Sequence, residues 1–125
     1  MSDIQTQSFV DLLLDSIDDS LLILGDEPRR AVYQYLATMK SLERKDIPYR
    51  LGDFESGLRS ALGGAARVVE RLILRKLFQK IGSVFKESND YEFGEHVTEA
   101  RRRYELAKLH QQQKDPASAN RLKKG

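Results

Sequence analysis

The sequence predicts an all-α protein, a compact bundle of about five helices with a central buried helix over residues 64–82 and a long C-terminal helix. Apolar residues recur three and four positions apart along most of the 125 residues, as on one face of a helix. Glycine and proline separate these runs. The chain shows no convincing period-two alternation, which is the mark of a half-buried strand. Together these observations favour helices packed around one core.

Length and composition indicate the class of protein. We expect a single helical domain over residues 1–115 and a disordered basic tail over residues 116–125, where the residues are small and polar. The absence of cysteine excludes disulfides and thiolate metal sites. No apolar run approaches the length of a membrane span, and no basic segment precedes an apolar stretch at the N-terminus. We therefore expect a cytoplasmic protein that does not contact membranes.

The first helix is expected to start within residues 3–8 and to end at Leu24, with Gly25 terminating it. The run Asp18-Asp19-Ser20 lowers helix propensity and allows a break in the middle. Its apolar residues are four, three, four and three positions apart, which predicts a seam facing the core. The seam consists of Val10, Leu14, Ile17, Leu21 and Leu24.

A second helix is expected from Pro28, which suits a first helical turn, to about residue 43, with Asp26 or Glu27 near its N-cap. Ile47-Pro48 should not continue a helix, because a residue before proline favours extended conformations. Asp53 is predicted to cap a short third helix that ends at Gly63-Gly64. The inward residues are expected to be Val32, Tyr35, Leu36 and Met39 in the second helix and Phe54, Leu58, Ala61 and Leu62 in the third.

The central helix carries apolar residues on two faces, and a helix of this kind is held between neighbours. The first stripe consists of Ala66, Val69, Ile73, Leu77 and Ile81. The second consists of Ala65, Val68 and Leu72. This pattern predicts the organising helix of the bundle.

The last helix is predicted to begin at the capping cluster Ser88-Asn89-Asp90 and to reach Gln113, before Asp115-Pro116 ends it. Its seam is only about two heptads long. It packs either on the first helix or on a second copy across a twofold axis, which would give a homodimer. The seam consists of Phe93, Val97, Ala100, Tyr104 and Ala107.

Several turn and core residues of the middle of the chain follow a familiar order. They are Leu24-Gly25-Asp26, Ala31 to Leu36, Ile47-Pro48, Phe54, Leu58, and Leu62-Gly63-Gly64-Ala65-Ala66 through Val69-Glu70, Leu77 and Gly82. This order, over roughly residues 23–82, resembles the nitrosopumilus output domain, a small archaeal all-α family. The chain departs from the family pattern at Asp26, where glutamate is usual, and at Leu62-Gly63-Gly64, where the family has Phe-Gly-x-Gly. The resemblance implies a signalling output module, often attached to sensor domains, and supplies no catalytic residues.

The net charge of +2 hides a strong polarity along the chain. Residues 1–28 contain seven acidic residues and no lysine or arginine, whereas residues 101–125 contain eight basic and two acidic residues. In one interpretation the acidic first helix and the basic last helix lie side by side. In the other, the basic end binds an acidic protein or a nucleic acid.

Two groups of basic residues are candidates for partner binding. Arg67, Arg71 and Arg75 form a ladder on the polar strip of the central helix, which suits a phosphate or an acidic partner. Alternatively, this strip pairs with the acidic first helix or with Glu70 and Glu55. The second group lies at the C-terminal end, where Glu99 and Glu105 are spaced to neutralise part of it locally. It consists of Arg101, Arg102, Arg103, Lys123 and Lys124.

The residues that would support catalysis are few. His96 shares one helix face with Glu92 and Glu99, but the repeat of this motif that a carboxylate-bridged metal site needs is missing, so we expect no metal. The chain has no Gly-x-Ser-x-Gly elbow, and Gly63-Gly64 lacks the strand and the Lys-Ser/Thr of a P-loop. We expect no catalytic residue and no cofactor.

Two functions remain after these exclusions. The preferred hypothesis is a non-enzymatic regulatory or adaptor domain that acts through protein–protein contacts, with a homodimer expected. The alternative is a protein associated with nucleic acid or the ribosome, bound through the basic residues of the central helix, the last helix and the tail.

Overall fold

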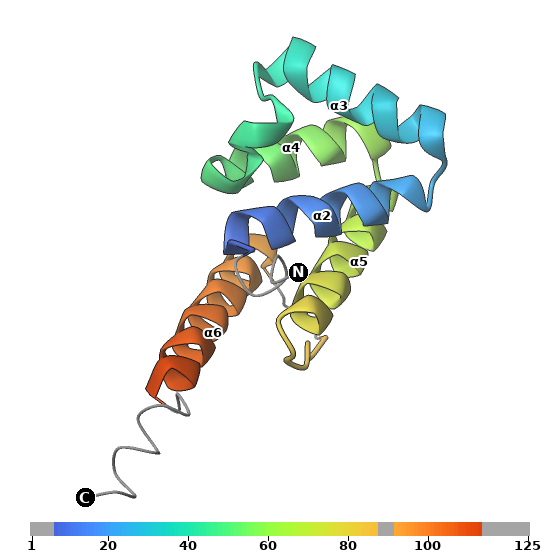
Figure 1. Ribbon diagram of the computed structural model, residues 1–125. Helices are drawn as coiled ribbons and strands as arrows, with labels where there is room; N and C mark the ends of the chain where they lie inside the picture. The colour runs from blue at the N-terminus through green and yellow to red at the C-terminus, as the bar shows by residue number, and fades with distance from the viewer. Residues whose placement is uncertain (1–6, 88–91, 114–125) are drawn as a thin grey trace, which may run out of the picture.

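The computed structural model describes residues 7–87 and 92–113 of the chain, and within these ranges it contains helices and no strand. The helices are α2 (Phe9–Leu22), α3 (Asp26–Lys40), the 3₁₀ helix η1 (Arg44–Tyr49), α4 (Leu51–Leu62), α5 (Ala65–Lys80) and α6 (Phe93–Gln113). They pack as a compact bundle (Figure 1), which confirms the predicted all-α fold.

Helix α5 is the centre of the bundle and packs against α2, α4 and α6. Its first predicted stripe is buried from Ala66 to Leu77. The second stripe was wrong, because Ala65 is exposed and Val68 is 57% exposed. The additional contact surface lies instead on the next row of the helix, where Glu70, Leu74 and Phe78 are buried. The two buried rows adjoin and form one wide face.

The first two α-helices differ from the prediction at their ends. Helix α2 begins at Phe9, one residue after the predicted window, because Ser8 caps it by accepting a hydrogen bond from the backbone N–H of Asp11 at 3.1 Å. It continues through Asp18-Asp19-Ser20 without a break and stops at Leu22. Leu24, predicted in the seam, is 39% exposed because it lies in the turn before Gly25.

Helix α3 begins at Asp26 after the N-cap residue Gly25, two residues before the predicted start. It ends at Lys40, and Met39, predicted to face inward, is 62% exposed. Leu42, just beyond the helix, is buried instead. Gly57 explains the close packing of α3 on α4, because a Cβ atom there would lie 2.2 Å from a methyl group of Leu36.

The segment around Pro48 forms the short 3₁₀ helix η1 rather than an extended turn, with Ile47 buried beneath it. Helix α4 then starts at Leu51, so Asp53 lies inside the first turn and does not cap it. The carboxylate of Asp53 accepts a hydrogen bond from Arg50 at 2.9 Å. Arg50 also donates to the backbone oxygens of Lys40 and Ser41, which ties the end of α3 to the start of α4.

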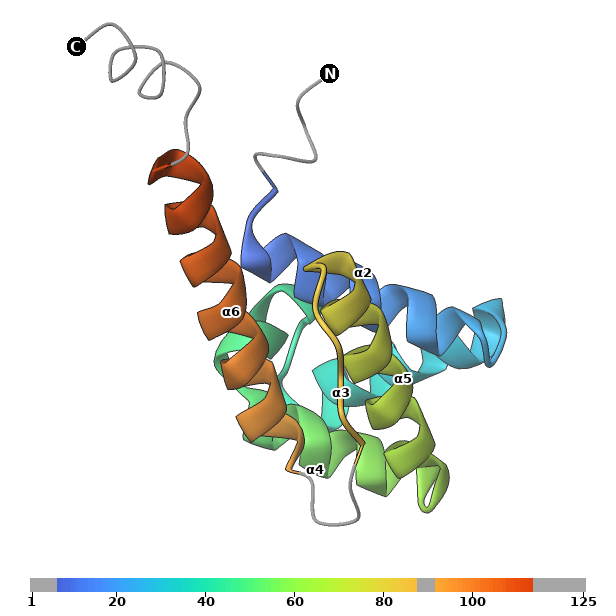
Figure 2. The ribbon, with the colours of Figure 1, turned by 90° about the horizontal axis from the view of Figure 1, so that it is seen from below.

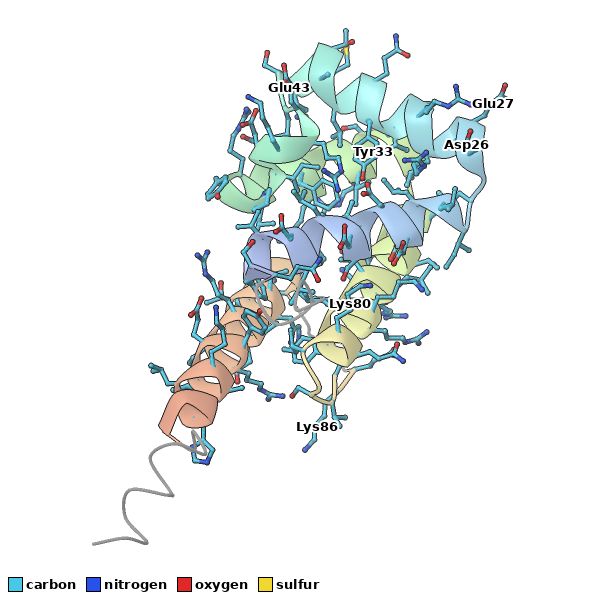
Figure 3. All side chains as sticks on the ribbon, in the orientation of Figure 1. Asp26, Glu27, Tyr33, Glu43, Lys80 and Lys86 are labelled. Carbon is cyan, nitrogen blue, oxygen red and sulfur yellow. The ribbon has the colours of Figure 1, made fainter. Side chains whose placement is uncertain are left out.

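Two carboxylates of α2 are bound by other elements of the body. Asp18 accepts hydrogen bonds from Tyr33 of α3 and from Arg44 of η1, the latter at 2.6 Å. Tyr33 lies between α3 and α2 (Figure 3). Burial alone would raise the pKa of Asp18, but the hydrogen bonds from Arg44 and Tyr33 lower it overall. The neighbouring Asp19 pairs with Lys80 of α5 at 3.3 Å.

Candidate functional site

Helix α6 has a docked half, residues 93–104, that belongs to the core of the bundle. Phe93, Val97 and Ala100 are buried, and the ring centroid of Phe93 lies 6.0 Å from that of Phe54 in α4. Tyr104, half-buried, packs on Phe9 with a centroid distance of 6.1 Å, and its hydroxyl donates a hydrogen bond to the backbone oxygen of Gln7. The docked half therefore contacts both α4 and the start of α2.

The loop after α5 runs back along that helix, between α5 and α6 (Figure 2), and Arg103 fastens it to α6. Nη1 of Arg103 donates to Oγ of Ser83 at 2.7 Å and to the backbone oxygen of Val84 at 3.3 Å. The guanidinium also stacks 5.4 Å from the ring centroid of Phe78. A cleft of about 450 Å³ lies beside this junction and is lined in part by Phe85 and His96, whose rings meet edge to face.

The arginines predicted for partner binding on α6 have intramolecular contacts. Glu99 accepts hydrogen bonds from Arg102 at 2.6 Å and from Arg103 at 2.8 Å. These hydrogen bonds, first from Arg102 and then from Arg103, lower the pKa of Glu99 to about 2. Arg101, which is exposed, lies with its guanidinium 5.8 Å from the ring centroid of Phe9. Much of the positive charge of this cluster is therefore neutralised within α6, as the spacing of Glu99 and Arg103 predicts.

The second half of α6, residues 105–113, extends past the other helices in both Figure 1 and Figure 2. We call it the projecting half. Every side chain from Glu105 to His110 is exposed, including Ala107, which was wrongly predicted to continue the buried seam. Among the described residues, Tyr104 is the last side chain of α6 that is half-buried, and the side chains after it have no packed neighbour from another helix. Leu106 and Leu109, three positions apart on one side of the helix, are 51% and 55% exposed.

The arginine ladder of α5 differs in exposure along its length. Arg67 is exposed, Arg71 is half-buried, and the side chain of Arg75 is 55% exposed. The carboxylate that pairs with Arg75 belongs to Glu87 of the loop after α5, at 2.5 Å. The sequence pattern did not predict this partner. The Arg75 end of the ladder therefore contacts the α5–α6 connection, while Asp19 of α2 pairs with Lys80 of α5.

Acidic side chains meet beneath the start of α6. Glu70 is only 3% exposed, and Glu55 lies next to Gly94, whose backbone N–H donates to the Glu55 carboxylate. Burial raises the pKa of Glu55, and the nearby charges of Glu70 and Glu92 raise it further. Among the residues that the structure describes, no group of three histidine, cysteine, aspartate or glutamate side chains is placed to hold a metal ion.

The sequence reasoning missed the exposed leucines of α6. Leu106 and Leu109 lie on the side of the helix opposite the predicted seam. Two leucines on a face that points away from the core were the signal that could have identified them.

Some of the predicted residues lie outside the part of the chain that the structure describes. They are Lys123 and Lys124, the tail over residues 116–125 and the cap Ser88-Asn89-Asp90. Within the described ranges, no helix has the length and apolarity that crossing a membrane requires.

The fold and this surface define an all-α bundle with a projecting C-terminal helix. Comparisons with known protein families, with curated proteins and with solved structures found no match. The resemblance of residues 23–82 to an archaeal output domain therefore stays a prediction from the sequence.

Proposed function

We propose that this chain is a non-enzymatic regulatory or adaptor domain that acts through protein–protein contacts, with the projecting half of α6 as its binding surface. The supporting observation is the exposure of Leu106 and Leu109 on a helix that has left the body of the bundle. Apolar side chains three positions apart on an exposed helix are the pattern by which a helix binds a groove or another helix.

The alternative partner is a nucleic acid, favoured by the eight basic residues between positions 101 and 125. Two of these, Arg102 and Arg103, are bound by Glu99, and Arg75 of the central helix is bound by Glu87. Binding to phosphates would have to compete with these carboxylates. We therefore favour a protein partner.

The test is affinity capture from extract, in parallel with and without nuclease treatment, followed by titration of the purified captured molecule. The variant Leu106→Ser with Leu109→Ser should weaken binding at least about tenfold, because it removes the apolar anchors. The control variant Met39→Ser with Tyr49→Ser changes two residues that are just as exposed, at 62% and 69%, on α3 and η1. Equal binding by the two variants would reject the surface. Retention of RNA or DNA alone, with an affinity that falls steeply with salt, would instead establish the alternative.

A further inference from the structure

The loop after α5 and the docked half of α6 border a cleft of about 450 Å³ that the proposed function does not use. Its walls come from three segments, which are the end of α5, the loop residues 82–86 and the docked half of α6. A volume of this size is typical of sites that bind small molecules. The side chains around the cleft indicate which class of small molecule would fit.

The ring of Phe85 forms an aromatic wall of this cleft. Its centroid lies 5.4 Å from that of the buried Phe78 and 5.1 Å from that of His96, whose ring meets it edge to face. These two contacts hold the ring of Phe85 in place, yet the residue is only half-buried. Part of a fixed aromatic ring therefore remains accessible for stacking with the ring of a ligand.

Arg103 forms a polar wall beside this ring. Its Nε donates a hydrogen bond to Glu99 at 2.8 Å, and its Nη1 donates to Ser83 and to the backbone oxygen of Val84. Its Nη2 carries two further N–H groups and donates to no residue in the described part of the chain. Because three hydrogen bonds already fix the guanidinium, these N–H groups are held ready for an anionic oxygen.

The charge of Glu99, the only acidic side chain among the described residues that line the cleft, is already balanced. Its Oε1 accepts a hydrogen bond from Arg102 at 3.1 Å. Its Oε2 accepts from Arg102 at 2.6 Å and from Arg103 at 2.8 Å. Two guanidinium groups thus surround one carboxylate, which leaves an excess of positive charge at this wall.

Lys86 adds a further positive charge at the rim of the cleft. Its side chain is exposed and extends from the loop after α5, as Figure 3 shows, and it forms no ion pair with the residues that the structure describes. The neighbouring Glu87 does not offset this charge, because its carboxylate pairs with Arg75 at 2.5 Å. The cleft therefore combines an aromatic wall with positive charge, which suits a ligand that has both an aromatic ring and an anionic group.

We propose that this cleft binds a small aromatic anion, with the ligand ring on Phe85 and the anionic group at Arg103 and Lys86. This site is additional to the surface in the proposed function, because Leu106 and Leu109 do not line the cleft. A ligand in this position contacts both the loop and α6. Its binding should consequently raise the temperature at which the chain unfolds.

The experiment titrates the full-length, isotopically labelled chain with three probes and follows its amide signals by nuclear magnetic resonance. 1-Naphthoate should shift the signals of residues 82–86 and 96–103 saturably, with a Kd of about 1 mM or tighter. 1-Naphthylmethylammonium, which has the same ring and the opposite charge, and acetate, which lacks the ring, should each bind at least about tenfold more weakly. Equal binding by either probe would overturn the proposal. So would the absence of a saturable shift, or shifts confined to other parts of the chain.

Two variants test the two walls separately. Lys86→Glu reverses the charge at the rim and should weaken binding of 1-naphthoate about fivefold. Phe85→Leu keeps an apolar side chain but removes the ring, and it should weaken binding at least about threefold. Binding by either folded variant that equals that of the original chain would overturn the proposal.

The matched control is Lys45→Glu, which reverses a charge on η1 whose side chain is 76% exposed. It should bind 1-naphthoate as the original chain does, and a loss equal to that in Lys86→Glu would overturn the rim contact. Circular dichroism establishes that each variant is folded. Should Phe85→Leu fail to fold, Lys86→Glu still decides, because its side chain is exposed. A failure of this inference leaves capture of a protein through Leu106 and Leu109 intact, so the two proposals are tested independently.

Discussion

The two halves of α6 differ in what surrounds them, although they are parts of one continuous helix. In the docked half, the apolar side chains of Phe93, Val97 and Ala100 are buried against the bundle. In the projecting half, Leu106 and Leu109 keep about half of their surface in contact with solvent. The first half supplies stability, and in our proposal the second supplies binding. Helix formation alone therefore does not reveal the role of a segment, because packing partners decide it.

The largest effect expected from this comparison is on stability. Phe93→Ala should lower the free energy of unfolding by about 3–5 kcal/mol, because it opens a cavity beside Phe54 at the α4–α6 contact. The control Leu106→Ala, in the projecting half, should change the free energy by less than about 0.5 kcal/mol. Urea denaturation of both variants measures the difference. Similar losses in the two would show that the projecting half is also packed.

A smaller effect is expected at the junction that Arg103 forms with the loop after α5. Arg103→Ala removes the hydrogen bonds to Ser83 and Val84 and should cost about 1 kcal/mol, because the guanidinium is partly exposed. Hydrogen exchange should become faster in residues 83–87 and stay unchanged in α3. The control Lys108→Ala removes a cation beyond the junction and should leave loop exchange unchanged. Unaltered loop exchange in Arg103→Ala would refute the fastening role.

The pH dependence of this junction follows from Glu99. Its pKa in the folded protein is about 2, below the ordinary value of 4.5, so its ion pairs stabilise the fold above about pH 4.5 and lose this contribution as the pH falls toward 2. Glu99→Gln should be less stable than the original chain at pH 7 and should approach it in stability near pH 2. Thermal unfolding across this range measures the convergence. A difference in stability between Glu99→Gln and the original chain that stays constant from pH 7 to pH 2 would contradict the lowered pKa of Glu99.

The pH dependence of stability expected from Glu55 has the opposite sign to that expected from Glu99. Its pKa is raised above 4.5, so the ionised carboxylate is disfavoured in the fold and stability is lost as the pH rises through the pKa of the folded state. Glu55→Gln should stabilise the protein at pH 7 by up to about 1 kcal/mol, since solvent screens part of the repulsion from Glu70 and Glu92. The gain should vanish near pH 4, where Glu55 is protonated. Glu27→Gln, at the exposed start of α3, is the control and should change little at either pH.

The smallest effect on stability is expected for changes at Leu106 and Leu109, which in our proposal have the largest effect on binding. Leu106→Ser with Leu109→Ser should change the free energy of unfolding by less than about 0.5 kcal/mol, because both side chains are already half-solvated. Chemical denaturation measures this value alongside the binding experiments. A loss above about 2 kcal/mol would indicate that the leucines stabilise the isolated fold, and the comparison between the halves of α6 would fail.

Local patterns were sufficient to predict the all-α fold and the position of most helices, because apolar period and helix-ending residues act over a few positions. They failed where burial depends on distant neighbours. Met39 and Val68 have the spacing of core residues, yet their side chains are 62% and 57% exposed. Glu70 is charged and would be expected at the surface, yet its side chain is buried on the face of α5 that packs against the neighbouring helices. These outcomes depend on how whole helices cross.

The candidate site shows the same division. The sequence by itself determined the long last helix, the neutralisation of Arg103 by Glu99 and the opposite charges of the two ends, since helix spacing and composition set all three. Only the tertiary structure decided that Arg75 meets Glu87, that Asp19 of α2 meets Lys80, and that α6 extends past the other helices with the side chains from Glu105 to His110 exposed. The physical reason is that periodicity identifies the faces of a helix, whereas the packing of the whole chain decides which of them are covered.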